Sequence, residues 1–187
     1  LVLIYGYSMG AMQAIHWAAM FPNRVQRVAA VCGAARASDY NIVFLDSLEA
    51  ALLADADCSA GQITGPCKRG LRAFGRIYAG WGVSEEFYRK ELWKGSSRDG
   101  VPFRDREDFV VRSYEGGFAS ASPLNLLAQI HSWRNADVGK ALDCSLEQAL
   151  GRITARVYFM PGSTDAYFRA SDIEAESRLV KKCRFVP

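Results

Sequence analysis

The chain has little histidine and no long apolar stretch. Only two histidines occur among its 187 residues, so a histidine-dependent site has few candidates. The apolar runs are far shorter than the about 20 residues that cross a bilayer, which excludes a transmembrane helix. No Asn-x-Ser/Thr glycosylation site occurs and no secretory signal is visible. We therefore expect a cytoplasmic protein.

Cysteines are odd in number and never form a Cys-x-x-Cys pair. They are Cys32, Cys58, Cys67, Cys144 and Cys183. A metal site needs closely spaced Cys or His ligands, so we expect no metal. We expect reduced thiols, and a Cys58–Cys67 bridge in a secreted form is the alternative.

An excess of one charge is also lacking. The 23 lysines and arginines stand against 20 acids without a long basic run, which gives a net charge of +3. Arginines and aromatic residues alternate over residues 70–93, but acids such as Glu85 and Glu91 lie among them. This mixture favours an amphipathic helix over a nucleic-acid surface, so we expect no nucleic-acid partner.

Residues 1–33 predict a strand–helix–strand unit. Residues 1–5 are apolar, as in a parallel strand covered on both faces, residues 11–21 favour a helix, and residues 25–32 predict a second strand. Such a unit implies a right-handed parallel crossover. Because the chain begins inside a predicted strand and without an initiator Met, we expect a fragment.

Residues 34–150 predict a mainly helical cap insertion, with apolar residues at helical spacing and little strand signal. Within them, Ser122 before Pro123 predicts a helix start.

Residues 151–187 return to the core pattern, with a buried strand over 153–160. Ser171 and Glu174 predict a capping box on the next helix. We thus expect an α/β fold, a parallel sheet with helices on both faces, interrupted by the cap.

A Gly-x-Ser-x-Gly pattern lies between the first predicted strand and helix, where residues 6–10 are Gly-Tyr-Ser-Met-Gly. A nucleophile on so tight a turn needs small neighbours two residues away on either side. The turn would raise the Ser8 hydroxyl at the carboxyl end of the sheet. There the Met9 backbone N–H and the helix dipole can stabilise an oxyanion. An incidental serine in a glycine turn is the alternative.

Asp165 follows the strand predicted over 153–160 by a few residues. An acid just beyond the carboxyl end of a parallel strand can orient a catalytic histidine. Asp172 competes for this role, but it lies in the first turn of a predicted helix, where the helix dipole accounts for it.

The base is the missing part of this site. A nucleophilic serine needs an imidazole within hydrogen-bond reach, and no histidine follows Asp165. His16 lies eight residues beyond Ser8, about 12 Å along a helix at 1.5 Å per residue. His131 lies on the apolar-striped cap helix, where a structural role is expected. We therefore expect the catalytic histidine outside this sequence.

Three segments resemble the homoserine O-acetyltransferase-like branch of the α/β-hydrolase superfamily. Residues 6–14 (Gly-Tyr-Ser-Met-Gly-Ala-Met-Gln-Ala) are similar to its Gly-x-Ser-Met-Gly-x-Met-Gln-Ala pattern. Residues 21–25 are similar to its helix-to-strand passage, and residues 162–168 to the segment that carries its acid. Only the first and last segments are specific. The resemblance implies a partial α/β-hydrolase fold with a cap.

The resemblance also implies roles for single residues: Ser8 as nucleophile, Met9 as oxyanion donor through its N–H, and Asp165 as triad acid. Members of the branch transfer an acetyl group from acetyl-CoA to a hydroxyl through an acyl-serine, and relatives hydrolyse esters. Homoserine acetyltransferases usually carry glycines where this chain has Tyr7 and Ala11. This difference argues against homoserine as the substrate.

Three hypotheses about function stay open. The first is acyl transfer to water or an alcohol through Ser8, with a small-molecule acyl substrate and no cofactor. The second is a CoA-dependent O-acetyltransferase, with acetyl-CoA as co-substrate. The third is a truncated, non-catalytic remnant. A homodimer is left open.

Overall fold

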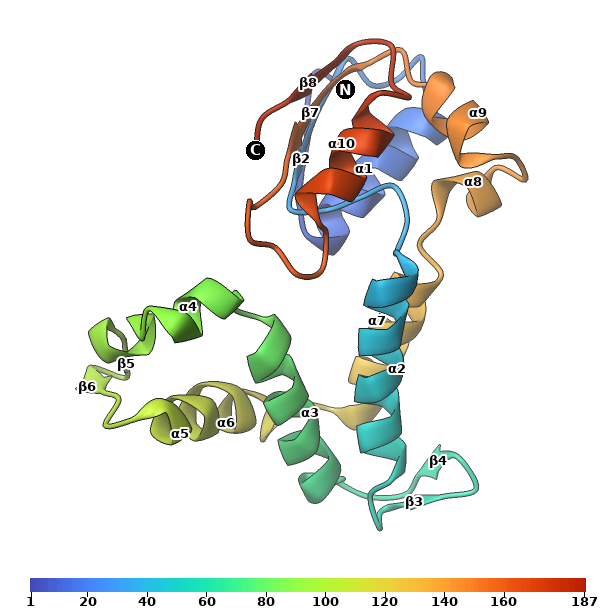
Figure 1. Ribbon diagram of the computed structural model, residues 1–187. Coiled ribbons are helices and arrows are strands. Elements are labelled where there is room, and N and C mark those ends of the chain that lie inside the picture. The colour runs from blue at the N-terminus through green and yellow to red at the C-terminus, as the bar shows by residue number, and fades with distance from the viewer. The chain divides into compact units, whose positions relative to one another are not determined.

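The computed structural model describes all of residues 1–187, which divide into two compact units. The sheet unit consists of Leu1–Asn41 and Trp133–Pro187 (Figure 1). The helical unit consists of Ile42–Ser132. None of the helices combines the length and the apolar character that a membrane span requires.

A parallel sheet forms the centre of the sheet unit. Its strands are β1 (Ile4–Tyr7), β2 (Arg27–Val31), β7 (Arg156–Met160) and β8 (Cys183–Phe185), in that spatial order. Each neighbouring pair is parallel. The predicted parallel sheet is confirmed.

Helices cover one face of this sheet (Figure 1). Val28 and Phe159 on that face are buried, whereas Tyr5 and Tyr7 on the other are exposed. Within residues 1–187 the connecting helices lie on one face for a topological reason. The strand order proceeds in one direction across the sheet, so right-handed crossovers place every connecting helix on the same side. These helices are α1 (Met9–Met20), α8 (Val138–Ala141), α9 (Leu146–Gly151) and α10 (Ala170–Ser177).

Two segments far apart in the chain pair beside the sheet. The Ala37 N–H donates to the Ala136 carbonyl at 3.2 Å, and the Val138 N–H donates to the Ala35 carbonyl at 3.1 Å. Between these bonds, Arg36 and Asp137 form an antiparallel bridge. Residues 34–41 and 133–150, which the sequence assigns to the cap, thus belong to the sheet unit.

The helical unit contains most of α2, the helices up to α7 and two short antiparallel hairpins. The start of α7 at Pro123, with Ser122 accepting from the Asn125 N–H at 3.3 Å, is confirmed. The elements are α2 (Asp39–Leu53), β3 (Cys58–Ser59), β4 (Gln62–Ile63), α3 (Lys68–Trp81), α4 (Glu85–Arg89), η1 (Leu92–Gly95), β5 (Ser97–Arg98), β6 (Val101–Pro102), α5 (Arg106–Phe109), the π-helical turn η2 (Val110–Glu115), α6 (Gly116–Phe118) and α7 (Pro123–Arg134).

The predicted capping box at Ser171 is wrong. Helix α10 begins at Ala170 with Arg169 at the N-cap, so Ser171 lies inside the first turn. A capping box instead opens α9, where Ser145 and Gln148 bond to each other's backbone. The pattern Ser-x-x-Glu therefore marked a helix but not its first residue.

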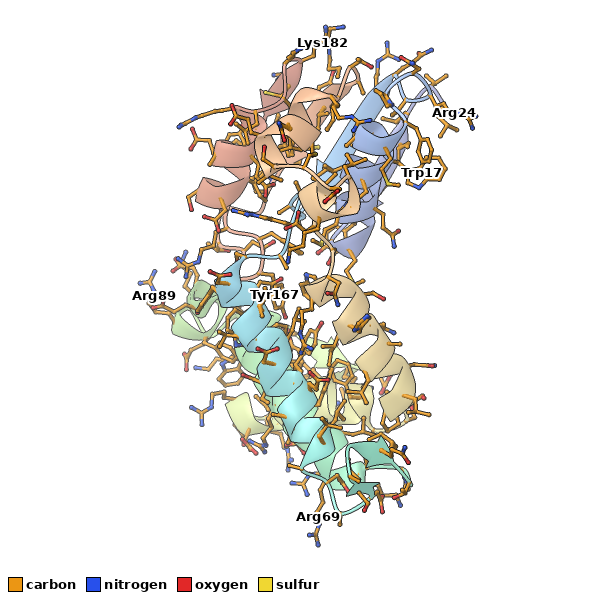
Figure 2. The ribbon with its side chains drawn as sticks, turned by 90° about the vertical axis from the view of Figure 1, so that its right-hand side faces the viewer. Trp17, Arg24, Arg69, Arg89, Tyr167 and Lys182 are labelled. Atoms are coloured by element: carbon orange, nitrogen blue, oxygen red, sulfur yellow. The ribbon has the colours of Figure 1, made fainter.

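Basic side chains are spread over both units. Figure 2 shows Arg24 and Lys182 pointing outward from the sheet unit, and Arg69 and Arg89 pointing outward from the helical unit. The spread agrees with the absence of a long basic run in the sequence.

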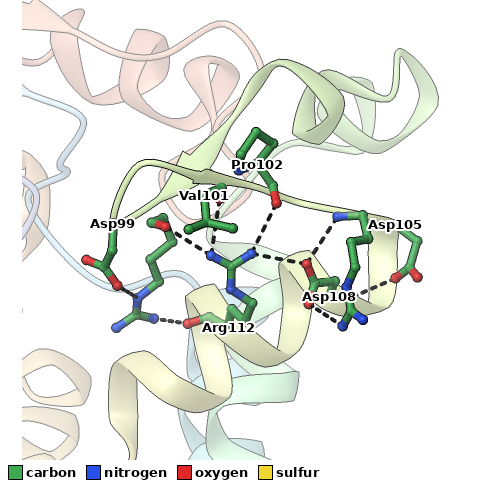
Figure 3. A network of polar contacts seen from close by, with 8 residues as sticks. Asp99, Val101, Pro102, Asp105, Asp108 and Arg112 are labelled. Carbon is green, nitrogen blue, oxygen red and sulfur yellow. Dashed lines mark hydrogen bonds and ion pairs between the residues drawn. The ribbon is translucent and has the colours of Figure 1, made fainter.

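A partly buried ion pair between Arg112 and Asp108 holds the second hairpin of the helical unit (Figure 3). The Arg112 guanidinium donates to the carbonyls of Arg98 at 2.9 Å, Val101 at 3.1 Å and Pro102 at 3.2 Å. It also donates to the Asp108 carboxylate at 3.1 Å. Asp108 thereby orients the side chain that ties β5 and β6 to η2.

Replacing Asp108 should loosen this hairpin. Hydrogen bonds from Arg104 first, and then from Arg112, hold the pKa of Asp108 well below its usual range. We expect Asp108→Asn to lower the melting temperature by about 4 °C or more, because the carboxylate charge and one of its acceptor oxygens are lost. The control Asp99→Asn, whose side chain is 92% exposed, should change it by no more than about 1 °C. Thermal denaturation followed by circular dichroism measures both, and equal shifts would contradict the assignment.

Candidate active site

Ser8 occupies a strained turn between β1 and α1. Its φ of 55° and ψ of −126° lie in a region that residues other than glycine rarely adopt. Its N–H donates to the Val31 carbonyl at 2.9 Å, and its carbonyl accepts from the Ala11 N–H at 2.8 Å. Strand β2 and helix α1 therefore hold the turn from two sides.

Close packing around this turn excludes a side chain at two glycines. A Cβ on Gly6 would lie 2.0 Å from the Gly10 carbonyl oxygen, and one on Gly33 would lie 2.6 Å from the Ser8 carbonyl oxygen. The need for a small residue before Ser8 is confirmed. After Ser8 it does not hold, because a Cβ on Gly10 would meet nothing within 4 Å. The sequence alone does not identify Gly33 as part of this turn, although a glycine directly after a predicted strand indicates a place where the backbone is closely approached.

Met9 is the first residue of α1. The first four N–H groups of a helix have no intrahelical acceptor, and the helix dipole is positive at that end. The Met9 N–H is thus suited to donate a hydrogen bond to the oxygen of a carbonyl group that the Ser8 hydroxyl attacks, because this oxygen becomes negative during the attack.

Asp165 lies in the loop that follows β7. Its Oδ1 accepts from the Tyr167 N–H at 2.8 Å and from the Phe168 N–H at 3.0 Å. The rings of Tyr167 and Phe168 pack on Trp133, with centroids 5.5 and 5.6 Å apart. Tyr167 is labelled at the end of the sheet unit in Figure 2. The loop is therefore anchored, and the direction of the carboxylate is set by two backbone donors.

Ser8 and Asp165 come from the same edge of the sheet. Each follows the carboxyl end of a strand, and the two strands are the neighbours of β2 on either side. In open α/β sheets this edge is where ligands bind. The order of the strands thus brings the nucleophile and acid that we predicted to one edge.

Neither histidine is placed beside Ser8 by the elements of the sheet unit. His16 donates from Nδ1 to the Met12 carbonyl at 2.8 Å, one turn earlier on α1. His131 is exposed on α7 in the helical unit. The sheet unit therefore brings no imidazole next to Ser8.

Glu176 is a buried carboxyl group that the sequence analysis missed. It is 7% exposed, and its Oε2 accepts from the Ala35 N–H at 2.7 Å. Burial raises its pKa to about 7, partly offset by the bond from Ala35 and by the charge of Arg36. Glu176 ties α10 to the segment that follows Gly33. A single glutamate on a short helix carries no signal of such a long-range contact.

Comparisons with known proteins agree with this geometry. No family model matches the chain. The chain is 33% identical over its whole length to the ethyl acetate hydrolase of Pseudomonas veronii, of which it covers 53%. The structure of the acetyl esterase MekB superposes with a TM-score of 0.91 at 33% identity, over 99% of this chain and 53% of that one.

The chain belongs to the α/β-hydrolase superfamily. The resemblance found in the sequence is confirmed. This α/β-hydrolase is also 30% identical over 88% of its length to a homoserine O-succinyltransferase of Paraburkholderia phytofirmans, of which it covers 47%. It shares the fold of a homoserine O-acetyltransferase from Bacillus anthracis, with a TM-score of 0.83 over 98% of this chain and 52% of that one, at 19% identity. The chain spans about half the length of these relatives.

The turn of this α/β-hydrolase should tolerate a methyl group at one glycine and not at the other. Gly6→Ala forces Cβ into the backbone of Gly10, so we expect unfolding or a melting temperature lower by about 10 °C. Gly10→Ala is the matched control, and its methyl group enters open space. Thermal denaturation of both variants checks this. Equal stability of the two variants would contradict the geometry of the turn.

Glu176 should make stability depend on pH. Its pKa of about 7 in the folded protein exceeds the ordinary value of 4.5, so the folded state holds the proton longer than the unfolded state. Stability is then lost as the pH rises from about 5 to 8. In Glu176→Gln this loss should shrink by a few kcal/mol, because Gln keeps an acceptor without a charge. Urea denaturation across this range measures it, with Glu174→Gln on the same helix as control. A wild-type pH dependence in Glu176→Gln would refute the assignment.

Proposed function

We propose that this α/β-hydrolase hydrolyses carboxylic esters through an acyl-serine intermediate on Ser8. The observation that carries the proposal is the strained turn of Ser8 at the start of α1, with Asp165 at the same sheet edge. Such a turn presents a hydroxyl with donors beside it, as acyl transfer requires. The ester hydrolase relative supports the same chemistry.

The proposed steps use few groups of this chain. The Ser8 Oγ attacks the carbonyl carbon of the ester, and its proton passes to a base. The carbonyl oxygen becomes negative and accepts a hydrogen bond from the Met9 N–H. The base returns the proton to the departing alcohol, and water then attacks the acyl-serine in the same way.

We propose a histidine outside residues 1–187 as this base, oriented by Asp165. His16 is held by its own helix, eight residues beyond Ser8. Asp165 is suited to orient an imidazole because its carboxylate is already directed by two backbone N–H groups.

Transfer of an acyl group to an alcohol is the second candidate function. The relative that is a homoserine O-succinyltransferase favours it. The acyl-serine would be the same, and an alcohol would replace water as its acceptor, with acetyl-CoA as a co-substrate. Tyr7 and Ala11 argue against homoserine as that alcohol. A cytoplasmic location stays a prediction, and a homodimer stays open.

Removing the Ser8 hydroxyl should abolish turnover. In the protein expressed from its complete gene, we expect Ser8→Ala to lower kcat on p-nitrophenyl acetate by about a thousandfold or more, because no acyl-enzyme forms. Ser171→Ala, an exposed serine on α10, is the control and should keep activity. Mass spectrometry should find the acyl adduct on the wild type alone. Turnover by Ser8→Ala would refute both candidate functions, and inactivity of the wild type would favour the non-catalytic remnant.

The products separate the two functions. With acetyl-CoA and a panel of alcohols, acetate alone indicates a hydrolase, whereas an acetyl ester of the alcohol indicates a transferase.

A further inference from the structure

Cys32 lies at the end of β2, between the strand that leads to Ser8 and the strand that leads to Asp165. The carbonyl of the preceding residue, Val31, accepts from the Ser8 N–H at 2.9 Å. The N–H of Cys32 donates to the Met160 carbonyl at 3.0 Å. The backbone around Cys32 is thus bonded to both neighbouring strand ends.

The backbone at Cys32 has a φ of 48°, which residues other than glycine rarely adopt. Besides burial, the negative charge of the neighbouring Asp165 carboxylate raises the pKa of the Cys32 thiol. The spacing at Gly162 agrees, because a Cβ there would lie 3.8 Å from the Cys32 Sγ and 3.5 Å from the Asp165 Cβ. The side chains of Cys32 and Asp165 therefore both lie next to Gly162.

The thiol is held in its protonated form. Burial, and after it the negative charge of Asp165, raise the pKa of Cys32, while a bond from the Gly162 backbone lowers it in part. A protonated thiol is a poor nucleophile but can donate a hydrogen bond. Cys32 is thus suited to a role as donor and not as a second nucleophile.

The hydrogen bonds of Asp165 leave room for this role. A carboxylate accepts about four hydrogen bonds. The N–H groups of Tyr167 and Phe168 both go to Oδ1, from within the loop. A thiol at the end of the neighbouring strand can supply a third donor, and acceptor capacity then remains for an imidazole.

We propose that Cys32 is a positioning residue, whose thiol donates to the Asp165 carboxylate and holds it in the direction that a catalytic histidine requires. The inference rests on the proposed function, because it assigns Asp165 the role of the triad acid. The two loop N–H groups fix one end of the carboxylate, and the thiol restrains its rotation. Loss of a group that orients a metal ligand typically costs about 10- to 100-fold in metal affinity or activity, and we expect a loss at the lower end of this range for a carboxylate oriented by one thiol.

Two substitutions at Cys32 separate a donor from a space-filling side chain. Cys32→Ser keeps a donor, whereas Cys32→Ala removes it, and both keep the Cβ at the strained φ. In the protein expressed from its complete gene, we expect Cys32→Ala to lower kcat on p-nitrophenyl acetate about tenfold with an unchanged KM. Cys32→Ser should stay within about threefold of the wild type. With equal melting temperatures, equal kcat values for the two variants would overturn the proposal.

The contact itself is tested without any activity. Asp165→Asn removes the charge that raises the pKa of the thiol, so iodoacetamide should alkylate Cys32 up to about tenfold faster at pH 8 for each pKa unit lost. Mass spectrometry of the tryptic peptide 28–36, in which Cys32 is the only cysteine, gives the rate. The control Asp172→Asn, exposed on α10, should leave it unchanged.

The two measurements fail in different ways. An unchanged alkylation rate in Asp165→Asn would remove the contact, and with it the inference, whatever the enzyme does. Turnover by Ser8→Ala would overturn the proposed function even if the thiol and the carboxylate are in contact.

Discussion

The hydrogen bond from the Ser8 N–H to the Val31 carbonyl is the constraint on which the rest of the site depends. It forces the chain to leave β1 in register with β2 and then to turn at once into α1. That turn is possible only because Gly6 and Gly33 leave space for backbone atoms. The strain at Ser8 is maintained because a sheet and a helix, each stable through many other contacts, meet at this residue.

The same edge of the sheet assembles groups by strand order and not by nearness in the chain. Ser8, Cys32 and Asp165 follow three adjacent strands, so parallel pairing alone brings together residues that are more than 150 positions apart. Glu176 also joins distant segments, because its carboxylate on α10 accepts a hydrogen bond from Ala35, which lies 141 positions earlier in the chain. A small set of long-range bonds therefore gives the edge its shape.

The sequence predicts the features that are local in the chain and misses those that depend on contacts between distant segments. The elbow at Ser8 was predictable because its glycines, strand and helix are contiguous, and Asp165 because it follows an apolar strand closely. Cys32, Gly33 and Glu176 depend on contacts with distant segments, and no local pattern reveals these. The capping box predicted at Ser171 was wrong because a serine followed three residues later by Glu or Gln occurs both inside α10 and at the start of α9, and only the second serine is an N-cap.

The pairing of residues 35–37 with residues 136–138 has a consequence for how such a chain changes over evolutionary time. The two ends of a loop of about a hundred residues are joined beside the sheet. The entropy of closing a loop grows only with the logarithm of its length, so insertions or deletions between these ends cost little stability. The helical segment can therefore diverge in size and surface while the strand ends that carry Ser8 and Asp165 keep their register.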